Sequence, residues 1–346
     1  MGLVSTEPAP TPVPASRSRL AAPGDAGAAT VLARSRDELA AALADAPDPR
    51  AVVMTMGALH EGHFDLVREA ARRVGPAGTV VVTIFVNPLQ FAPTEDLDSY
   101  PRDLEGDLAG LTRTLTGVDG ALGVGRLVVF APTPEVIYPA GQPAVRIDPG
   151  PIATVLEGRT RPTHFAGVCQ VVLTLMHLTA PRWALFGRKD AQQLAIIESM
   201  VRDLAVPLEI VPVDIRRESD GLAMSSRNAY LSPEQRRQAL ALSRALQAGR
   251  DAAAQAAGSG TRPDPAAIRR AALASLEAAD GVEIDYVALV DPAGFEDLTD
   301  AGLGLPRRAP VHEDAGEGLP AVGLLAVAAR VGTTRLIDNT LIDLHP

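Results

Sequence analysis

Apolar runs and amphipathic segments alternate along this chain between about residue 31 and residue 215. Short runs dominated by Val, Leu and Ile, the pattern of strands buried in a sheet, occupy residues 51–55, 79–86, 127–131, 182–186 and 208–213. Segments whose apolar residues recur at helical spacing lie between them, at residues 60–73, 101–113, 167–179 and 190–204. This alternation predicts an α/β fold, in which helices cover a Rossmann-like doubly wound parallel sheet.

The pattern changes after about residue 216. Two helices rich in Ala and Arg, followed by strand-like runs, are predicted at residues 233–257, 265–279, 282–290, 324–331 and 334–337. These elements predict a smaller C-terminal α+β unit. We therefore expect a Rossmann-like nucleotide-binding domain at residues 29–215 and a C-terminal lid domain at residues 216–346.

Three segments are predicted to lie outside the packed elements. Residues 1–28 are rich in Pro, Ala, Ser and Thr and lack a continuous apolar segment, so we expect a disordered extension and not a secretory signal. Residues 117–125 and 302–320 are rich in Gly and have the composition of surface loops.

Composition narrows the range of functions. The 346 residues are 47% hydrophobic but only 3% aromatic, so the core must be aliphatic. The 32 Lys and Arg against 42 Asp and Glu give a formal net charge of −10, which argues against binding of nucleic acid or an anionic membrane surface. No apolar stretch approaches the roughly 18 residues of a membrane span. Because the chain as a whole is acidic, any site for an anion must be a local cluster of positively charged residues.

The single cysteine, Cys169, excludes an intrachain disulfide and favours a cytoplasmic protein. It falls in an apolar run, where it is best interpreted as a small buried hydrophobic side chain. We therefore predict no reactive role for this thiol.

Candidate chemistry begins at the junction of the first predicted strand and helix. The sequence MGALHEGH places His60 and His63 three residues apart, and glycines at positions 57 and 62 allow a ligand to approach the backbone closely. A helix N-terminus offers free N–H groups and partial positive charge, so imidazoles at this point suit the phosphates of a nucleotide. Ordinary polar residues of a first helical turn are the alternative. A zinc site would need further ligands, and no such set is evident.

The sequence IFVNPLQF follows at the end of the next buried strand. A turn accounts for Asn87 and Pro88. It does not account for Gln90, an amide between Leu89 and Phe91. We interpret Gln90 as part of a pocket for a small polar ligand.

Two further segments bring cations to predicted helix starts. The sequence RPTHFAGV contains Arg161 and His164, which fit a local anion site or a plain helix entry equally well. The sequence FGRKDAQQ places Lys189 at a helix N-terminus, where a cation is unfavourable unless an anion is bound. Asp190 suits an N-cap or a functional carboxylate, and Gln193 lies one turn inside the helix.

The segment DGLAMSSRN combines hydroxyl groups, an arginine and a glycine. Such a loop can wrap a triphosphate through backbone and hydroxyl donors while Arg227 supplies charge. Taken alone, it also fits a simple turn. Its position after the other motifs favours a second cationic segment directed at the same phosphates.

In this order, the segments MGALHEGH, IFVNPLQF, RPTHFAGV, FGRKDAQQ and DGLAMSSRN resemble the pantothenate synthetase (pantoate–β-alanine ligase) family of the HIGH-motif nucleotidyltransferase superfamily. The resemblance covers about residues 50–232 and extends weakly to TTRLIDN at residues 333–339. It implies a cytoplasmic homodimer that condenses pantoate with β-alanine. It also implies ATP and Mg²⁺ as requirements, a pantoyl-adenylate intermediate, and AMP and pyrophosphate as products.

The resemblance further implies roles for individual residues. His60, His63 and Lys189 would be catalytic, with His63 as the proton donor. The implied ATP site comprises Met56, Gly57, Ala58, Leu59, His60, Glu61, Gly62, His63, Gly187, Arg188, Lys189, Asp190, Arg216, Met224, Ser225, Ser226 and Arg227. The implied site for pantoate and β-alanine comprises Gln90, Gln193, Arg161 and His164.

Two positions depart from the family pattern. Arg188 stands where the family has Glu in its GEKD stretch, which adds a positive charge beside Lys189. In Glu105-Gly106-Asp107 a glycine stands where an aspartate is common, so the acidic cluster associated with magnesium is thinner. We assign no metal ligand and expect Mg²⁺ to depend mainly on the triphosphate.

Other interpretations stay open at this point. An adenylyltransferase of the same superfamily would share the histidine motif, but it would need basic residues for an acceptor phosphate and would not call for Gln90 and Gln193. A non-catalytic nucleotide-binding protein is disfavoured by the intact histidines and cations. A tRNA-binding enzyme is disfavoured by the negative net charge.

Overall fold

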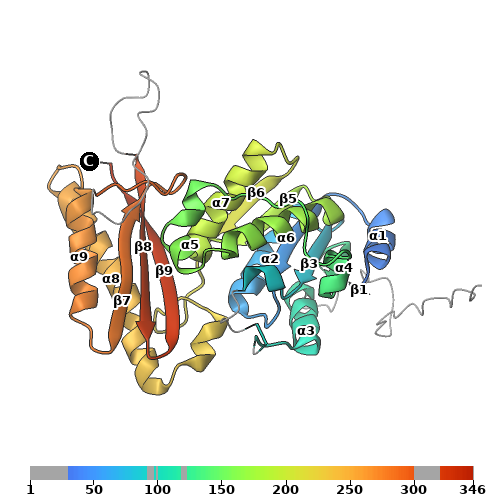
Figure 1. Ribbon diagram of the computed structural model, residues 1–346, viewed down its shortest axis with the longest axis horizontal. Coiled ribbons are helices and arrows are strands. Elements are labelled where there is room, and N and C mark those ends of the chain that lie inside the picture. The colour runs from blue at the N-terminus through green and yellow to red at the C-terminus, as the bar shows by residue number, and fades with distance from the viewer. Residues whose placement is uncertain (1–29, 92–96, 99, 118–122, 300–319, 346) are drawn as a thin grey trace, which may run out of the picture.

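The computed structural model describes residues 30–345 except 92–96, 99, 118–122 and 300–319. At its centre lies a parallel sheet in the strand order β1-β4-β3-β2-β5-β6. The strands are β1 (Thr30–Ala33), β2 (Arg50–Thr55), β3 (Thr79–Ile84), β4 (Arg126–Phe130), β5 (Trp183–Gly187) and β6 (Glu209–Val213). Figure 1 shows this sheet in the right-hand part of the molecule and a smaller sheet on the left.

Helices cover both faces of the parallel sheet. They are α1 (Arg36–Ala44), α2 (Glu61–Val74), α3 (Leu104–Leu115), α4 (Pro134–Ile137), α6 (His164–Thr179) and α7 (Ala191–Asp203). The same part of the chain contains the short helix α5 (Glu157–Thr160) and the 3-10 turns η1 (Pro88–Gln90), η2 (Pro151–Thr154) and η3 (Arg188–Asp190). Alternate strand residues point to opposite faces. Val52 and Val81 pack with α1, α6 and α7, whereas Val53 and Val80 pack with α2 and α3. Burial on both faces explains why the strands read as continuous apolar runs.

The strand order reverses next to β2. The chain runs outward through β3 and β4 on one side of β2, and through β5 and β6 on the other. β2 and β5 are paired neighbours, with Val52 opposite Ala184. In open parallel sheets, ligands bind beyond the carboxyl ends of the strands at such a reversal. The loops that follow Thr55 and Gly187 therefore meet where binding is expected.

The second sheet is antiparallel and lies toward the C-terminus. Its elements, with those that precede it, are η4 (Ser226–Tyr230), α8 (Pro233–Gly258), α9 (Pro265–Glu277), β7 (Val282–Val290), β8 (Val322–Val331) and β9 (Thr334–Asp343). Val287 and Leu325 pack with α8 and α9 on one face. Ala288 and Ala326 face the other way and pack with Ala195 of α7. We call residues 30–213 the larger unit and residues 233–344 the C-terminal unit; the second face of the small sheet joins them (Figure 1).

The predicted fold class, a doubly wound parallel sheet with a smaller α+β unit, is confirmed. The sequence pattern did not predict β1 and α1, and it predicted that β9 ends at residue 337, whereas β9 extends to Asp343. The next three residues, Asp338, Asn339 and Thr340, are polar and interrupt the apolar pattern, yet they are only 3%, 6% and 4% exposed. Residues 1–28, and most of the predicted loops at 117–125 and 302–320, lie outside the described residues.

Two of the expectations above concern the described part of the chain. None of its helices is both long enough and apolar enough to cross a membrane. Cys169, on α6, is fully buried, and this burial raises the pKa of its thiol to about 11. The predicted burial of Cys169 is confirmed, and a buried protonated thiol is a weak nucleophile.

Gly167 sets how closely α6 approaches η1, and it provides a test of this packing. A Cβ at this position would lie 2.2 Å from the backbone carbonyl oxygen of Leu89. We predict that Gly167→Ala lowers the free energy of unfolding by about 1–3 kcal/mol, because α6 and η1 must move apart. Chemical denaturation measures this change.

Gly258→Ala, at the end of α8, is the matched control. No atom lies within 4 Å of a Cβ added at Gly258, so this variant should unfold like the parent. If both variants unfold at the parent's midpoint, the tight contact between α6 and η1 does not limit stability.

Candidate active site

A cavity of about 570 Å³ lies between the larger unit and the C-terminal unit. A volume of this size suits a small-molecule ligand. The predicted site residues that line it are Arg161, His164, Lys189, Asp190, Gln193, Ser225 and Arg227. Residues that the sequence did not single out complete the wall, among them Glu157, Gln192, Tyr286, Arg335, Asp338 and Asn339.

The loop that leaves β2 is held by Asp107 of α3. Its Oδ2 accepts a hydrogen bond from Ala58 N at 3.1 Å, and its Oδ1 accepts one from Leu59 N at 2.7 Å. Gly57 and Ala58 have φ values of 86° and 51°, so the backbone turns through the left-handed region here. Asp107 is 4% exposed, and burial raises the pKa of its carboxyl although the two N–H donors oppose this. The carboxylate therefore shapes the loop.

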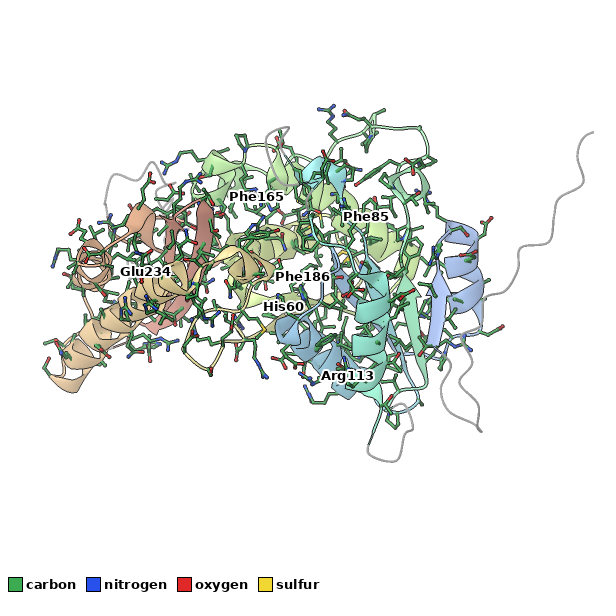
Figure 2. The ribbon with its side chains drawn as sticks, turned by 90° about the horizontal axis from the view of Figure 1, so that it is seen from below. His60, Phe85, Arg113, Phe165, Phe186 and Glu234 are labelled. Carbon is green, nitrogen blue, oxygen red and sulfur yellow. The ribbon has the colours of Figure 1, made fainter. Side chains whose placement is uncertain are left out.

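The two histidines begin α2 and fix one another. His60 is the N-cap, and its Nδ1 accepts from Gly62 N at 3.2 Å. His63 Nδ1 accepts from His60 N at 3.3 Å, and the ring centroids are 4.1 Å apart. A Cβ on Gly62 would lie 3.0 Å from the His60 ring, so a larger residue at position 62 would crowd this ring. Figure 2 shows His60 near the junction of the larger unit and the C-terminal part of the chain.

These contacts determine which nitrogen of each neutral imidazole carries the proton. Because a backbone N–H can only donate, each Nδ1 must accept, and we assign the proton of each neutral ring to Nε2. Burial, with the charge of Lys189, lowers the pKa of His60. Burial, His60 and Lys189 together lower the pKa of His63 to about 3. Both rings are therefore neutral at pH 7 and keep an Nε2–H for a ligand.

Lys189 and Asp190 follow β5 on η3. Lys189 Nζ lies 3.2 Å and 3.4 Å from the two carboxylate oxygens of Asp190. The protein atoms that surround the Asp190 carboxyl act to raise its pKa, but the charges of Lys189 and Arg227 outweigh this effect and hold the pKa below its ordinary value. Asp190 makes no capping hydrogen bond to α7. It is therefore an ionised partner of a cationic cluster.

Arg161 and His164 contact the backbone of Gln90. Arg161 Nη2 and His164 Nδ1 each lie 3.1 Å from the Gln90 carbonyl oxygen. A carbonyl can only accept, so His164 Nδ1 carries a proton, and in the neutral ring Nε2 accepts from Arg161 Nη1 at 3.3 Å. Gln90 is 8% exposed on η1. The fully buried Asn87 caps η1 through Leu89 N, which is the turn role predicted for it.

The two glutamines at the start of α7 differ in direction. Gln193 lines the cavity. Gln192 is 4% exposed and donates through Nε2 to Ile152 O at 2.6 Å and to Val155 O at 2.8 Å. Its Oε1 accepts from Glu157 N at 3.1 Å. Gln192 therefore holds the wall of the cavity that Gln193 faces.

The segment between the two units folds back on itself. Met224 N donates to Arg216 O at 2.9 Å. Ser225 is the N-cap of η4, and its Oγ accepts from Arg227 N at 3.3 Å. Ser225 and Arg227 line the cavity, whereas Ser226 does not. The predicted hydroxyl and guanidinium groups thus come from a structured turn.

Several predicted residues do not line the cavity, namely Met56–His63, Gln90, Gly187, Arg188, Arg216, Met224 and Ser226. Arg216 Cβ would lie 3.6 Å from a Cβ at Gly62, so Arg216 sits against the N-terminus of α2. The side chain of Arg188 pairs with Asp214 at 3.2 Å, in a separate shallow hollow of the surface. The additional charge of Arg188 is therefore not directed into the cavity.

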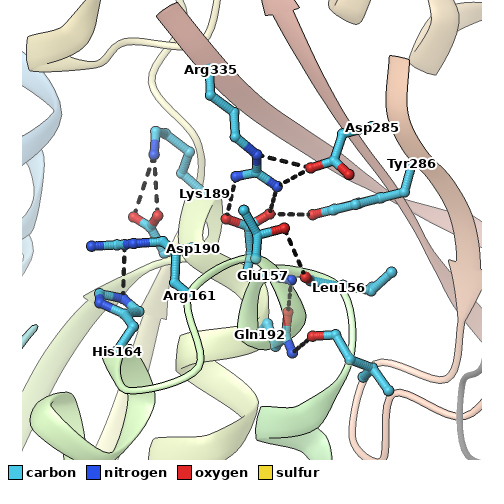
Figure 3. A network of polar contacts seen from close by, with 12 residues as sticks. Leu156, Glu157, Arg161, His164, Lys189, Asp190, Gln192, Asp285, Tyr286 and Arg335 are labelled. Carbon is cyan, nitrogen blue, oxygen red and sulfur yellow. Dashed lines mark hydrogen bonds and ion pairs between the residues drawn. The ribbon is translucent and has the colours of Figure 1, made fainter. Parts of the chain in front are cut away.

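Glu157 connects the two units through a network that the sequence did not reveal (Figure 3). Arg335 of β9 donates to both of its carboxylate oxygens at 2.7 Å, and Tyr286 donates its hydroxyl to Oε1 at 2.9 Å. Asp285 accepts from Arg335 Nη2 at 2.7 Å. The side chains of Glu157 and Arg335 are 13% and 15% exposed. Burial, reinforced by Glu157, raises the pKa of Tyr286, which stays a hydrogen-bond donor.

Within the described residues, no three His, Cys, Asp or Glu side chains converge where a metal ion could bind. Two carboxylates near the predicted site residues already have partners: Asp107 accepts from backbone N–H groups, and Asp190 pairs with Lys189. The described residues therefore offer a divalent cation no ready site.

Comparison with known proteins identifies the family. The family model for pantoate-beta-alanine ligase matches residues 31–341. The chain belongs to this family. Pantothenate synthetase from Streptomyces avermitilis is 46% identical over 352 residues, covering 90% of this chain and 97% of the relative. Pantothenate synthetase 4 from Frankia alni is 53% identical over 290 residues, covering 84% and 82%. The family resemblance noted from the motifs is confirmed, and the protein is a ligase.

Solved structures of pantothenate synthetases share the fold. The enzyme from Thermus thermophilus has a TM-score of 0.74 at 40% identity, covering 91% of this chain and 99% of the other. Pantoate-beta-alanine ligase from Francisella tularensis, described as complexed with beta-gamma ATP and beta-alanine, has a TM-score of 0.64 at 28% identity, covering 90% and 98%. The structural matches therefore lead to the same family as the sequence matches.

Sequence reasoning missed the residues that hold the site in shape. Asp107 was weighed only for magnesium, and Gln192 was passed over beside Gln193. Arg335 and Asn339 fall in the weakly matching TTRLIDN segment. Two features of the sequence could have indicated these residues: a polar residue next to a candidate residue, and a polar residue inside an otherwise apolar strand. Buried polar groups require hydrogen-bond partners, so such residues are expected to hold neighbouring segments in place.

We predict that His63 in the free enzyme stays neutral when the pH falls to 5, because its pKa is about 3. Nuclear magnetic resonance of ¹⁵N-labelled imidazole measures this directly, and His63→Gln identifies the signal. Binding of a triphosphate should raise the His63 pKa, because the anion stabilises imidazolium. A midpoint near 6.5 in the free enzyme would contradict the neutral site.

The lowered pKa of His63 also makes the free energy of unfolding depend on pH. A histidine whose folded pKa is lowered favours folding above its unfolded pKa of 6.5, and this stability is lost as the pH falls toward about 3. The parent should therefore lose more stability than His63→Gln in this range, by up to about 1.4 kcal/mol per pH unit.

Proposed function

We propose that this ligase condenses pantoate with β-alanine and uses ATP to activate pantoate as a pantoyl-adenylate. The observation that carries the proposal is that the loop with His60 and His63 and the loop with Lys189 leave the paired strands β2 and β5 at the reversal of the parallel sheet, and that Lys189, Gln193 and Arg227 line the cavity. Membership of the pantoate-beta-alanine ligase family supports it. So does the relative described as complexed with beta-gamma ATP and beta-alanine.

In the first step, a carboxylate oxygen of pantoate attacks the α-phosphorus of ATP. The bond from that phosphorus to the bridging oxygen of the β-phosphate breaks, and pyrophosphate leaves. No protein nucleophile is needed, so catalysis consists of positioning and charge stabilisation. The Nε2–H groups of His60 and His63, the Lys189 ammonium and the N-terminus of α2 would stabilise the growing charge on pyrophosphate.

The low pKa of His63 refines the role of proton donor that the family resemblance implied. A neutral imidazole with its proton on Nε2 donates a hydrogen bond readily but gives up that proton only with difficulty. We therefore assign His63 to hydrogen-bond donation in the free enzyme's protonation state. Transfer of a proton would require the bound anion to raise its pKa first.

In the second step, the neutral amine of β-alanine attacks the carbonyl carbon of pantoyl-adenylate. The new C–N bond forms, the bond to the phosphate oxygen breaks, AMP leaves, and the amine loses a proton. The amides of Gln90 and Gln193 would orient pantoate, and Gln90 would also meet β-alanine. Arg161 and His164 would act by holding the Gln90 carbonyl, which they contact in the structure.

The remaining ATP-site assignments follow the loops around the cavity. The triphosphate would lie against Met56–His63, with Glu61 in the first turn of α2, and against Gly187, Asp190 and the backbone of Arg188, whose side chain points away. Met224, Ser225, Ser226 and Arg227 would face it from the segment between the units, and the backbone of Arg216 would lie near adenine. Mg²⁺ would arrive with the nucleotide, as part of the substrate.

The proposal also includes the assembly, the location and the domain division. We propose a cytoplasmic homodimer, as the family resemblance implied. We further propose that residues 29–215 bind nucleotide and pantoate and that residues 216–346 form a lid. Light scattering coupled to gel filtration tests the dimer.

Purified protein mixed with pantoate, β-alanine, ATP and Mg²⁺ should form AMP and pantothenate in equal amounts. With β-alanine omitted, labelled pyrophosphate should exchange into ATP only when pantoate is present, because the adenylate step is reversible. AMP formation without pantothenate would indicate a different acceptor. ATP binding without any turnover would favour the nucleotide-binding alternative.

His63→Ala should lower kcat by about two orders of magnitude or more, the scale of removing a charge-stabilising group. His177→Ala is the matched control, because His177 is exposed on α6 and contacts only Leu173 O among the bonds described for it. Steady-state assays of AMP release compare the two. Near-normal kcat in His63→Ala would refute the assigned role.

Removal of Mg²⁺ with EDTA should abolish AMP formation, and excess Mg²⁺ should restore it. The melting temperature of the protein without nucleotide should not change, because the described residues offer the ion no ready site. A clear rise in melting temperature with Mg²⁺ alone would reveal a resident protein site instead.

A further inference from the structure

Three successive polar residues are buried on β9, at the point where the apolar pattern predicted the strand to end. Asp338, Asn339 and Thr340 are 3%, 6% and 4% exposed. Burial of polar groups is unfavourable unless they are hydrogen-bonded, so their partners reveal what the strand holds. Asp338 and Asn339 each contact a different segment of the proposed phosphate site.

Asn339 reaches the loop that carries Lys189. Its Nδ2 donates to Arg188 O at 2.9 Å and to Lys189 O at 2.8 Å. One side-chain amide therefore fixes two successive carbonyl groups of η3. The direction in which Lys189 leaves the backbone depends on this contact from the C-terminal unit.

Asp338 reaches the segment between the units. Its carboxylate accepts from Arg217 Nη1 at 2.7 Å and from Nη2 at 3.0 Å, a bidentate pair. Arg217 also donates to Gly221 O at 3.1 Å and pairs through its backbone with Ala223, just before Ser225 and Arg227. The same Asp338 carboxylate accepts from Asn339 N at 2.8 Å, which ties the two contacts together.

We propose that Asp338 and Asn339 are positioning residues for the ATP phosphates. Asn339 places Lys189, and Asp338 places the segment that carries Arg227, so that two neighbouring residues of one strand set the distance between the two cationic segments. This inference rests on the proposed function, in which Lys189 and Arg227 bind the triphosphate. Neither Asp338 nor Asn339 needs to touch ATP. The C-terminal unit thereby controls groups that belong to the larger unit and to the connecting segment.

The expected effect is large because catalysis by positioning is sensitive to small displacements. A shift of about 1 Å in a group that binds the reacting phosphates can lower the rate by about 100-fold. Asn339→Ala should therefore lower kcat/KM for ATP by about 10- to 100-fold at saturating pantoate. The KM for pantoate should change less than about 3-fold, because the hydrogen bonds that the Asn339 side chain makes in the described part of the chain go to Arg188 O and Lys189 O and not to Gln193 or Gln90.

A double-mutant cycle with Lys189→Ala tests whether Asn339 acts through Lys189. If it does, Asn339→Ala should lower kcat/KM for ATP by less than about 3-fold in the Lys189→Ala background, although it has its full effect in the parent. A full multiplicative loss in both backgrounds would overturn the inference. The same cycle applies to Asp338→Asn with Arg227→Ala.

Thr340→Val is the matched control on the same strand. Thr340 is equally buried, and its hydroxyl accepts from Arg250 Nε of α8 at 2.7 Å, away from the phosphate segments. It should leave kcat/KM for ATP near the parent value. An equal loss in Thr340→Val and Asn339→Ala would show general damage to β9 and overturn the inference. Asn339→Ser, which is too short to reach both carbonyls, replaces Asn339→Ala if circular dichroism shows that the latter does not fold.

The outcomes separate this inference from the proposed function. If Lys189→Ala leaves kcat/KM for ATP unchanged, the proposed phosphate site is wrong, and the positioning role falls with it. If Lys189→Ala lowers kcat/KM about 100-fold but Asn339→Ala does not, the phosphate site stands and only the positioning role is refuted.

Discussion

The pairing of β2 with β5 is the constraint on which the rest of the site depends. Both strands run parallel, so the loops after Thr55 and Gly187 leave the same edge of the sheet as neighbours. This is why Lys189 acts on the pKa of both His60 and His63, although they lie far apart in the sequence. A different strand order would place the histidines and the lysine at separate positions along the edge, and no side-chain substitution could bring them back together.

The negative net charge of the chain explains why positive charge must be concentrated at the site. With a net charge of −10, the protein does not attract anions in general, and its cations must be concentrated where they are needed. Without a bound anion, two imidazolium ions near Lys189 would repel one another and the lysine. Neutral rings avoid this repulsion and still present Nε2–H donors, since both Nδ1 atoms are occupied by backbone N–H groups. The capping geometry of α2 thus prepares the site before any nucleotide binds.

The sequence predicted the elements where burial produces a regular pattern. The valine-rich strands are buried on both faces, and α8 and α9 have clear helical periodicity, so these elements were found within a few residues of their ends. Residues clustered in loop motifs, such as Lys189 and Arg227, could also be found, and both line the cavity. By contrast, β9 was predicted too short because Asp338 and its neighbours are polar and buried.

The supporting contacts could not be predicted because they join residues distant in the chain. Arg335 and Glu157 are 178 residues apart, and Asn339 and Arg188 are 151 apart. Neither periodicity nor local spacing carries information about such pairs. Asp107 shows the same difficulty at shorter range, since its partners are backbone N–H groups that any residue type would provide.

The two kinds of contact between the units have different consequences. The apolar face formed by Ala288 and Ala326 is non-directional and fixes only how closely the units approach. The Glu157–Arg335 pair and the Asn339 amide are directional, so they fix the register of β9 against α5 and η3. If the C-terminal unit moved away, Glu157 would lose its buried ionic partner as the Lys189 loop lost Asn339, and an unpaired buried carboxylate is costly. The docked arrangement and the conformation of the loop that carries Lys189 therefore depend on the same set of contacts.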